Sequence, residues 1–551
     1  MQMFRTTFVY LLVILTTCQL FGMTSLHITK QFNLAEFKIT QNDNKMTEID
    51  TDLMDVYFGE PYMPSIPEFE IRYALPCNTT IDSIKYIATK VKIGENIVLS
   101  TNYPPVHFND SWDSTNMISR PTYPLGVYPQ TACKIRDVTS WNTINVAYIR
   151  ISPFEYNAAE KTLYFRESFQ IEMTLKELAR NEQPNKKKIS PSISTIVKSI
   201  VDNPEQVDDY LYDDNPLVSQ PISSADSDDS DNVEYLIITS DSLAASFEPL
   251  RRWRERTGLH SRIVTTEEVY SASNLPTCQQ KIKSYIQRLY TNKNLTYVLL
   301  GGDDTVVPTQ YCQAKVTSVD SVHTDFIPSD VFYASTEGSF DWDANKNGIV
   351  GEKDEDGVSQ SLSLYVSRLP ARTSKDVKSM IDKILSYEKH PQWHGKMLLA
   401  GNKLTHNPND EYQNDAELQS IQMYRAYVDR GWTGDTVCFF DSHTSFEGDA
   451  TFDVTPSNFH KVIGGGYEFI TMASHGNTDR WSMESEGAYT SALASTLTNK
   501  GNSIFFTASC NTNAFDHNET QFASGCLSES LLRNPNSGIC LLYTSPSPRD
   551  S

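Results

Sequence analysis

Two short segments of the chain each end in a side chain that can take part in nucleophilic chemistry. The segment Tyr467–Gly476 reads YEFITMASHG, and the segment Asn502–Asn511 reads NSIFFTASCN. Each begins as an apolar run and ends in small residues beside one reactive group, His475 in the first and Cys510 in the second. Buried strands of an open α/β sheet are continuous apolar runs, and ligands bind beyond their carboxyl ends. We therefore predict that two neighbouring parallel strands bring this imidazole and this thiol to one edge of a sheet.

An imidazole beside a thiol predicts a cysteine nucleophile. The His475 imidazole takes the thiol proton and leaves a thiolate–imidazolium pair with Cys510. Gly476 lets the backbone approach a substrate closely, and its N–H group is a candidate oxyanion donor together with that of Cys510. A lone cysteine is most often a small core residue, so the prediction depends on the pair.

Several further blocks lie around this pair: SHGNTDRW, FTASCNTNAFD, CLSESLLRNPNSG, LTYVLLGGDDTVVP, PSDVFYA and LYVSRLPARTSKDVKSMIDKILSYEKHP. In combination they resemble the gingipain-type cysteine peptidases, which share the caspase–legumain catalytic architecture, over about residues 233–538. The resemblance implies two caspase-like subdomains, with His475 as general base and Cys510 as nucleophile in the second. It also implies a third group that orients the imidazole, for which Asp330 and Asp325 are the candidates.

Three other residues in these blocks each have two interpretations. Trp481 follows the histidine at the family's spacing, and it either lines the substrate cleft or packs as an ordinary tryptophan. Asp303 and Asp304 end a predicted strand, where carboxylates either face the active edge or cap the next segment.

The elements that must carry the pair alternate between strand and helix from Val233 onward. VEYLIITS reads as a buried strand, and the amphipathic helix after it is stopped by Gly258. The pattern restarts at Lys396 with another apolar run. Such alternation predicts an α/β fold, a doubly wound and mostly parallel sheet with helices on both faces. We divide it into a first α/β subdomain at residues 233–395 and a second, caspase-like subdomain at residues 396–539.

The region before this domain has a different pattern. Residues 23–180 alternate apolar and polar positions between turn residues, which predicts an antiparallel β-sandwich. The block GEPYMPSIPEFEIRYALP resembles the propeptide domain of gingipain-type peptidases, which implies a folding aid that covers the active site. The alternative is a permanent adhesion or accessory domain. Residues 181–232 are rich in uncompensated acidic residues, which predicts a flexible linker open to activation cleavage.

The two ends of the chain and its cysteines bear on the cellular compartment in which the protein is expected. Residues 1–22 read as a signal peptide, with a membrane anchor as the alternative, and predict a secreted or lysosome-like location. Residues 540–551, CLLYTSPSPRDS, read as a non-native tail, with a genuine polar tail as the alternative. Cysteine spacing allows two disulfides, although it cannot fix connectivity. The residues concerned are Cys77 with Cys133 and Cys278 with Cys312. Glycosylation sequons occur at Asn78, Asn109, Asn294 and Asn518.

Residues 343–354 follow the template of a calcium-binding loop. Side-chain oxygens stand at positions one, three and five, the backbone carbonyl at seven and a carboxylate at twelve. The predicted ligands are Asp343, Asn345, Asn347, Ile349 and Asp354. Position twelve is Asp where the template has Glu, which shortens the reach of the carboxylate. We predict structural Ca²⁺, with a polar surface turn as the alternative, and no zinc site, since His and Cys are not grouped.

The overall charge narrows the class of partner. The formal net charge is −22, which argues against a nucleic-acid-binding surface. The sequence therefore predicts a secreted zymogen of a cysteine endopeptidase that hydrolyses peptide bonds in protein or peptide substrates. No membrane partner is expected after signal-peptide removal. The alternatives are a transpeptidase or ligase that uses the same dyad, and an inactive homologue that acts as a binding or adhesion protein.

Overall fold

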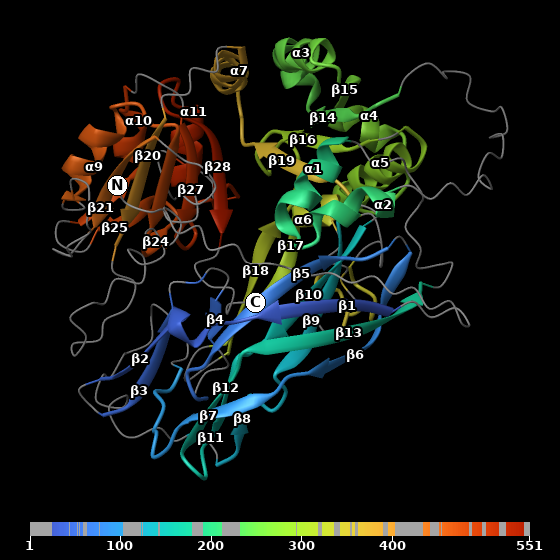
Figure 1. Cartoon of the computed structure of the whole chain (residues 1–551). Helices are drawn as coiled ribbons and strands as arrows, with labels where there is room; N and C mark the ends of the chain where they lie inside the picture. The colour runs from blue at the N-terminus through green and yellow to red at the C-terminus, as the bar shows by residue number, and fades with distance from the viewer. Residues whose placement is uncertain are drawn as a thin grey trace, which may run out of the picture. The chain divides into compact units, whose positions relative to one another are not determined.

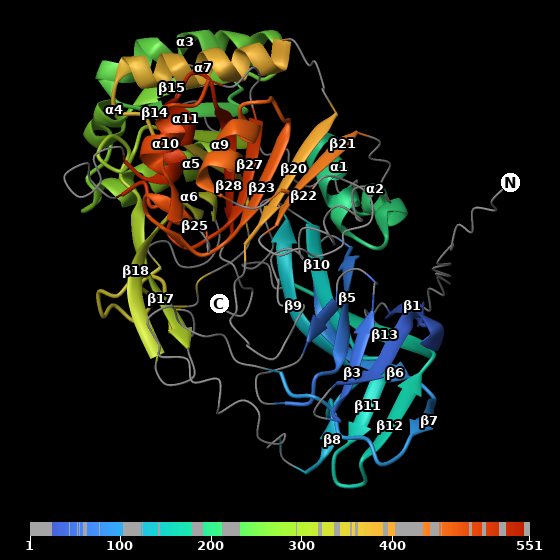
Figure 2. The ribbon, with the colours of Figure 1, turned by 90° about the vertical axis from the view of Figure 1, so that its left-hand side faces the viewer.

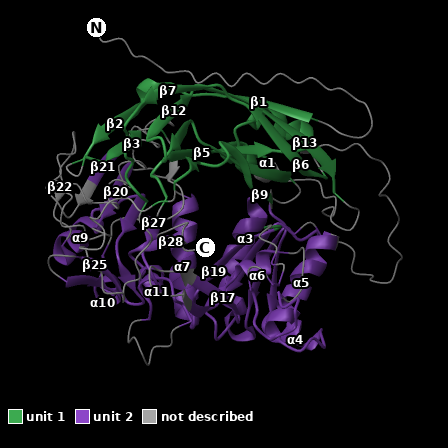
Figure 3. Ribbon diagram, turned by 90° about the horizontal axis from the view of Figure 1, so that it is seen from below, with its two compact units in different colours: residues 1–224, 360–363 green, residues 225–359, 364–551 purple. Residues whose placement is uncertain are grey.

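The computed structural model separates the chain into two compact units. Unit 1 comprises residues 1–224 and 360–363, and unit 2 comprises residues 225–359 and 364–551 (Figure 3). The residues whose placement is described are 25–42, 45–51, 53, 56–58, 63–76, 78–102, 123, 125–141, 144–178, 191–211, 232–293, 295–317, 322–335, 342–352, 355–356, 358, 362–389, 395–402, 434–440, 451–452, 455–483, 487–498, 503–516 and 525–544. Within these ranges, no helix is both long enough and apolar enough to cross a bilayer.

Unit 1 is built from antiparallel strands. Its strand orders are β1-β13-β6, β4-β5-β10-β9, β7-β12-β11-β8 and β2-β3 (Figure 1). Their bounds are β1 Ser25–Gln31, β2 Phe37–Gln41, β3 Thr47–Thr51, β4 Val56–Phe58, β5 Pro67–Ala74, β6 Thr79–Ile87, β7 Lys90–Gly94, β8 Val127–Tyr128, β9 Cys133–Trp141, β10 Ile144–Ile151, β11 Phe154–Asn157, β12 Thr162–Arg166 and β13 Ser168–Glu177. Apolar residues from several sheets meet in one core, which includes Phe37, Ile149, Phe154 and Phe169. The antiparallel character predicted for residues 23–180 is confirmed.

The prediction of a flexible linker is wrong for residues 191–211, which form α1 (Pro191–Ile200), the 3-10 turn η3 (Pro204–Gln206) and α2 (Val207–Leu211). This segment docks on β5. The Asn203 amide accepts a hydrogen bond from the Ala74 N–H (2.8 Å) and donates one to the Ala74 carbonyl (3.0 Å). Its buried apolar residues are Val197, Val201 and Val207. The acidic composition of residues 181–232 concealed these buried valines.

The first sheet of unit 2 is fully parallel and has helices packed on both faces. Its order is β15-β14-β16-β19 (Figure 1). The bounds are β14 Tyr235–Thr239, α3 Asp241–Arg256, β15 Ser261–Thr265, α4 Thr266–Ser271, α5 Cys278–Lys293, β16 Tyr297–Gly301, β19 Tyr365–Leu369 and α7 Ser374–Lys389. Ile237 of β14 shares a core with Phe247 of α3 and Val377 of α7, whereas Leu236 shares another with Ile282 of α5. Figure 2 shows α3 and α7 side by side.

The second sheet of unit 2 is also fully parallel, with the order β22-β21-β20-β23-β27-β28. The bounds are β20 Lys396–Gly401, β21 Asp435–Phe440, β22 Thr451–Phe452, α9 Pro456–Ile463, β23 Phe469–Ala473, α10 Ser491–Ser495, β27 Ser503–Ala508, α11 Leu527–Arg533 and β28 Gly538–Thr544. The predicted restart at Lys396 is confirmed, since β20 begins there. β28 runs across the predicted boundary at residue 540 and pairs with β27 as far as Thr544, while the non-native origin of residues 540–551 stays a prediction.

Two antiparallel elements complete unit 2. A hairpin joins β17 (Gln310–Thr317) to β18 (Val322–Ser329) and is followed by α6 (Val331–Ala334). A small sheet of β24 (Gly476–Asn477), β25 (Arg480–Met483) and β26 (Gly487–Thr490) follows β23. The disulfide that the cysteine spacing allowed between Cys278 and Cys312 is not formed. Both are free thiols, with Cys278 exposed at the start of α5 and Cys312 buried in β17. Cys133 is also a free thiol, and Cys77 lies outside the described residues.

Candidate active site

The two predicted catalytic residues leave neighbouring strands at equivalent positions. β23 and β27 pair in parallel, and the last pair is Ala473 with Ala508. His475 and Cys510 each stand two residues beyond that pair. The predicted adjacency of the two strands is therefore confirmed, and the register brings both residues to the same edge of the sheet. Cys510 is partly accessible, as an attacking thiolate needs to be.

A buried pair of serines lies between the strand ends and the two reactive residues. The Ser474 and Ser509 hydroxyls are 3.2 Å apart, and both residues are fully buried. The Ser474 N–H also donates to the Ala508 carbonyl at 3.3 Å. These contacts extend the pairing of β23 and β27 by one residue and fix the two chains as they turn out of the sheet.

Gly476 is packed against the segment that carries the nucleophile. A Cβ atom at this position would lie 2.5 Å from the Cys510 carbonyl oxygen, 2.9 Å from Thr512 Cγ2 and 3.0 Å from Ser509 Cβ. Only a residue without a side chain allows this approach. The geometry therefore gives Gly476 a packing role beside Cys510, whereas the predicted oxyanion role of its N–H group stays a prediction.

Trp481 belongs to the core. It is fully buried, its indole N–H donates to Thr507 Oγ1 of β27 at 3.0 Å, and its ring stacks on Tyr489. The Ser482 N–H next to it donates to the His475 carbonyl at 2.8 Å. Trp481 thus supports the small sheet that follows the histidine, and the interpretation as an ordinary packed tryptophan is the one that the structure favours.

The amino end of α11 contacts the segments that follow both reactive residues. The Leu527 N–H donates to the Thr478 carbonyl at 2.9 Å, three residues beyond the histidine. The Ser528 N–H donates to the Thr512 carbonyl at 3.1 Å, and the Ser528 hydroxyl donates to Asn513 Oδ1 at 2.5 Å. This helix therefore ties together the two loops that leave the sheet edge.

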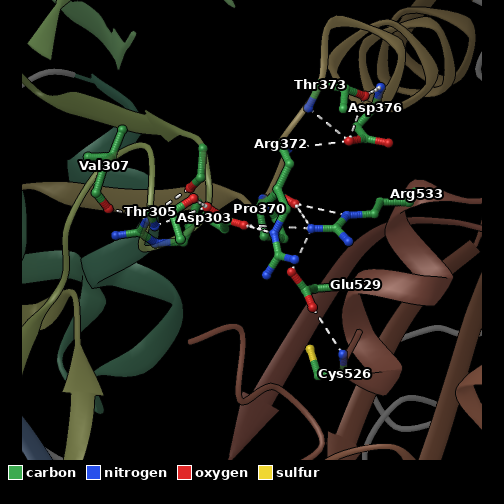
Figure 4. Close-up of polar contacts among 12 residues, drawn as sticks. Asp303, Thr305, Val307, Pro370, Arg372, Thr373, Asp376, Cys526, Glu529 and Arg533 are labelled. Carbon is green, nitrogen blue, oxygen red and sulfur yellow. Dashed lines mark hydrogen bonds and ion pairs between the residues drawn. The ribbon is translucent and has the colours of Figure 1, made fainter. Parts of the chain in front are cut away.

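A buried network of ion pairs connects α11 to the first sheet of unit 2 (Figure 4). Glu529 is fully buried and accepts hydrogen bonds from the Cys526 N–H (2.9 Å) and from Arg533 (2.7 Å). Burial raises the pKa of Glu529, and the adjacent Arg533 opposes that rise. Arg533 also donates to the Pro370 carbonyl at 3.0 Å and lies 3.9 Å from the Asp303 carboxylate. Sequence reasoning missed this network, for which the Glu-x-x-x-Arg spacing in α11 is the one signal.

Asp303 and Asp304, at the end of β16, have separate environments. Asp303 is fully buried, pairs with Arg372 and accepts hydrogen bonds from the Thr305 N–H (3.0 Å) and hydroxyl (2.6 Å). The capping interpretation is therefore confirmed for Asp303. Burial and the neighbouring carboxylates of Asp303 and Asp516 raise the pKa of Asp304.

The structure places Asp330 against an arginine. Its carboxylate accepts two hydrogen bonds from Arg368, from Nε and from Nη2 at 2.7 Å each, and one from the Thr309 hydroxyl at 3.1 Å. The role of Asp330 in orienting His475 stays a prediction. The other candidate, Asp325, is exposed on β18 and accepts a hydrogen bond from the N–H of the next residue, Phe326.

The predicted calcium loop turns through three residues with left-handed backbones, Lys346 (φ 60°), Gly348 (φ 82°) and Gly351 (φ 83°). The side-chain oxygens at positions one, three and five each accept a backbone N–H, at 3.2, 3.0 and 2.7 Å. These acceptors are Asp343, Asn345 and Asn347. Asp354 lies outside the described residues. Ile349 donates its N–H within this turn.

Two buried carboxylates close this loop. Glu352 accepts hydrogen bonds from the Asn345 and Asn347 amides at 3.2 and 2.6 Å. Asp356, which sequence reasoning missed, is fully buried and accepts the N–H groups of Ala344 (3.0 Å) and Glu352 (2.9 Å). The part of the chain that the structure describes contains no group of three His, Cys, Asp or Glu side chains arranged to hold a metal. The loop has oxygen ligands of the kind that Ca²⁺ takes, and the metal itself stays a prediction.

Comparison with known proteins gives one family for this domain. Residues 228–548 match the family described as peptidase family C25. Gingipain R1 of Porphyromonas gingivalis is 21% identical over 533 residues, covering 94% of this chain and 46% of that protein. Gingipain R2 of the same species is 20% identical over 520 residues, covering 92% of this chain and 61% of that protein. This chain thus spans between about half and three-fifths of these relatives.

Solved structures also align with part of this chain. The structure described as a complex of Porphyromonas gingivalis RgpB pro- and mature domains aligns with a TM-score of 0.41 and 18% identity, covering 56% of this chain and 63% of that chain. The family match over residues 228–548 is the stronger finding, and it includes every residue of the proposed site.

Proposed function

The chain belongs to peptidase family C25, and from that premise we propose that it is a cysteine endopeptidase made as a zymogen. The observation that carries this proposal is the parallel register of β23 and β27, which brings His475 and Cys510 to one sheet edge. The partial accessibility of Cys510 supports it, because a substrate must reach the sulfur.

In the first half of the proposed reaction, His475 holds the proton of Cys510 and the thiolate attacks the carbonyl carbon of a peptide bond. A carbon–sulfur bond forms, and the carbonyl oxygen becomes an oxyanion that the N–H groups of Gly476 and Cys510 stabilise. The tetrahedral intermediate then breaks its carbon–nitrogen bond. The His475 imidazolium gives its proton to the departing amine, and a thioester remains on Cys510.

In the second half, water replaces the departed amine. His475 takes a proton from that water as its oxygen attacks the thioester carbon. The carbon–sulfur bond breaks, and the product leaves as a carboxylic acid that loses its proton to solvent. Cys510 and His475 return to the thiolate–imidazolium pair. The site needs no redox partner, since the bond changes balance with one water molecule consumed for each peptide bond cleaved.

The experiment that tests this function compares two single-cysteine variants. The full chain is expressed, proteolysed within the acidic residues 212–231, and assayed on a mixed peptide library by mass spectrometry. Cys510→Ala should abolish cleavage and leave the folded state intact. Cys278→Ala, which removes an exposed free thiol at the start of α5, should cleave as the wild type does. Turnover that persists in Cys510→Ala would end the proposal.

We also propose that the amino-terminal part of unit 1, which begins at residue 23, is the propeptide, and that the chain is secreted after loss of residues 1–22. The propeptide would include residues 191–211, because these dock on β5 of unit 1. If so, activation cleavage falls after residue 211. Sequencing the amino terminus of the mature enzyme tests this, and a mature chain that begins before residue 211 contradicts it.

A further inference from the structure

The loop that begins at the proposed nucleophile is held at its far end by an arginine of the other sheet. The Arg368 guanidinium lies over the Phe515 ring, 4.7 Å from its centroid. Phe515 stands five residues after Cys510 and is 8% exposed. Arg368 is in β19, so this contact joins the first sheet of unit 2 to the nucleophile loop of the second. A cation placed on a ring face and shielded from water is attracted strongly to it.

Arg368 has almost no freedom to move. Its side chain is 6% exposed, and it donates through all three of its nitrogen atoms. Asp330 accepts two of these hydrogen bonds, and the carbonyls of Gly302 (2.8 Å) and Val307 (2.7 Å) accept two others. Hydrogen bonds in the guanidinium plane leave its flat face as the surface available to Phe515. Because these hydrogen bonds fix the plane of the Arg368 guanidinium, they also fix the position at which the Phe515 ring packs on it.

A second contact from the first half of unit 2 reaches the same loop. The Tyr311 hydroxyl of β17 donates to the Asp516 carboxylate at 3.1 Å, one residue after Phe515. The loop is therefore fixed at residues 515–516 by β17 and β19, and at residues 512–513 by α11. Cys510 begins a short loop whose path is set by three separate elements.

We propose that Arg368 is a positioning residue for the nucleophile, and that Asp330 acts through it as the counter-ion that fixes the guanidinium. This inference rests on the proposed peptidase function. It gives Asp330 a role different from that of orienting His475. In this arrangement the Asp330 carboxylate holds Arg368, Arg368 holds Phe515, and Phe515 holds the loop that places the Cys510 sulfur.

The consequence for rate follows from geometry. Displacing a reacting atom by about 1 Å costs on the order of 10²-fold in rate. We expect Phe515→Leu, which keeps an apolar side chain and removes the ring, to lower kcat by about 10- to 100-fold with a smaller change in KM. Phe515→Tyr keeps the ring and should retain most of the activity. Phe326→Leu is the matched control, because Phe326 is 51% exposed on β18.

A double-mutant cycle separates the two roles of Asp330. If Asp330 acts through Arg368 and Phe515, the losses in kcat caused by Asp330→Asn and Phe515→Leu will not multiply in the double variant. If Asp330 instead orients His475, the losses will multiply, and Asp330→Asn alone will shift the pH midpoint of Cys510 alkylation. The second result overturns the inference. Wild-type kcat in Phe515→Leu also overturns it.

Two further measurements keep the outcomes distinct. Alkylation of Cys510 by iodoacetamide, followed by mass spectrometry, reports the position and reactivity of the thiol without any turnover. If the wild type cleaves no peptide, the peptidase proposal fails, and slower alkylation in Phe515→Leu than in Phe326→Leu still supports the positioning role. Should Phe515→Leu fail to fold, Phe515→Met replaces it in the cycle, with folding checked by circular dichroism.

Discussion

The contact between Gly476 and the nucleophile loop allows a substitution whose effect can be worked out from distances. In Gly476→Ala, the new methyl group and the Cys510 carbonyl oxygen must move apart by about 0.9 Å, from 2.5 Å to the 3.4 Å at which ordinary contact begins. The obstructing atom belongs to the backbone of the nucleophile itself, so no side-chain rotation relieves the clash. Overpacking of this kind costs roughly 1–3 kcal/mol of folding free energy.

The larger effect should be on rate. A shift of nearly 1 Å in the residue that carries the sulfur lowers kcat by about 10²-fold. Steady-state hydrolysis of the best library peptide gives kcat, and urea unfolding gives the free energy of unfolding. The control is Gly464→Ala at the end of α9, where the nearest atom is 3.5 Å away, an ordinary contact. That variant should be neutral in both assays. Wild-type kcat in Gly476→Ala would refute the claim that this contact places the nucleophile.

Three further outcomes are expected. Lys383 of α7 is buried and donates at 2.6 Å to each of three backbone carbonyls, those of Leu532 in α11, of Asn534 just after it and of Gly538 at the start of β28. Burial lowers the pKa of Lys383 to about 7. Between about pH 7 and pH 10, Lys383 is therefore neutral in the folded state and takes up a proton on unfolding. The free energy of unfolding of the wild type, relative to that of Lys383→Met, should rise with pH over this range by at most about 1.4 kcal/mol per pH unit. Urea titrations of both proteins at several pH values measure this difference in the free energy of unfolding. If the difference stays constant between about pH 7 and pH 10, the prediction is contradicted. Glu529→Gln should cost about 3 kcal/mol, because it removes the nearer of the two carboxylates that balance the buried charge of Arg533. Glu248→Gln, at a more exposed ion pair of α3, should cost under about 1 kcal/mol. Equal losses in the urea midpoint of unfolding would argue against the buried network. Millimolar Ca²⁺ should raise the melting temperature of the wild type and leave that of Asp343→Asn unchanged, and an equal shift in both would place any calcium elsewhere.

Local patterns predicted the parts of the fold that depend on neighbouring residues. The apolar runs before His475 and Cys510 gave the strands β23 and β27, and the restart at Lys396 gave the beginning of β20. Parallel pairing followed from the alternation of strands and helices. These predictions succeeded because burial of a whole strand leaves a continuous apolar signature in the sequence.

Contacts between distant residues could not be predicted in the same way. The identity of a charged residue is the same whether it is buried and paired or exposed on the surface. The pairing of Asp330 with Arg368, 38 residues away, therefore leaves no pattern in the sequence. A related reason left the two interpretations of Trp481 open and put the three valines of residues 191–211 in a segment predicted to be flexible. Whether an apolar side chain is buried depends on a surface that another part of the chain provides.

The docking of residues 191–211 also protects an edge of unit 1. Along Arg72–Ala74, β5 has no bonds to β4, and Asp202 and Asn203 take up its N–H and carbonyl groups there. Unpaired strand edges attract strands from other molecules and promote aggregation. A fragment of unit 1 that stops at residue 190 would expose this edge, whereas one that continues to residue 211 would keep it covered. The boundary chosen for producing the amino-terminal domain alone therefore decides whether this edge of β5 stays covered.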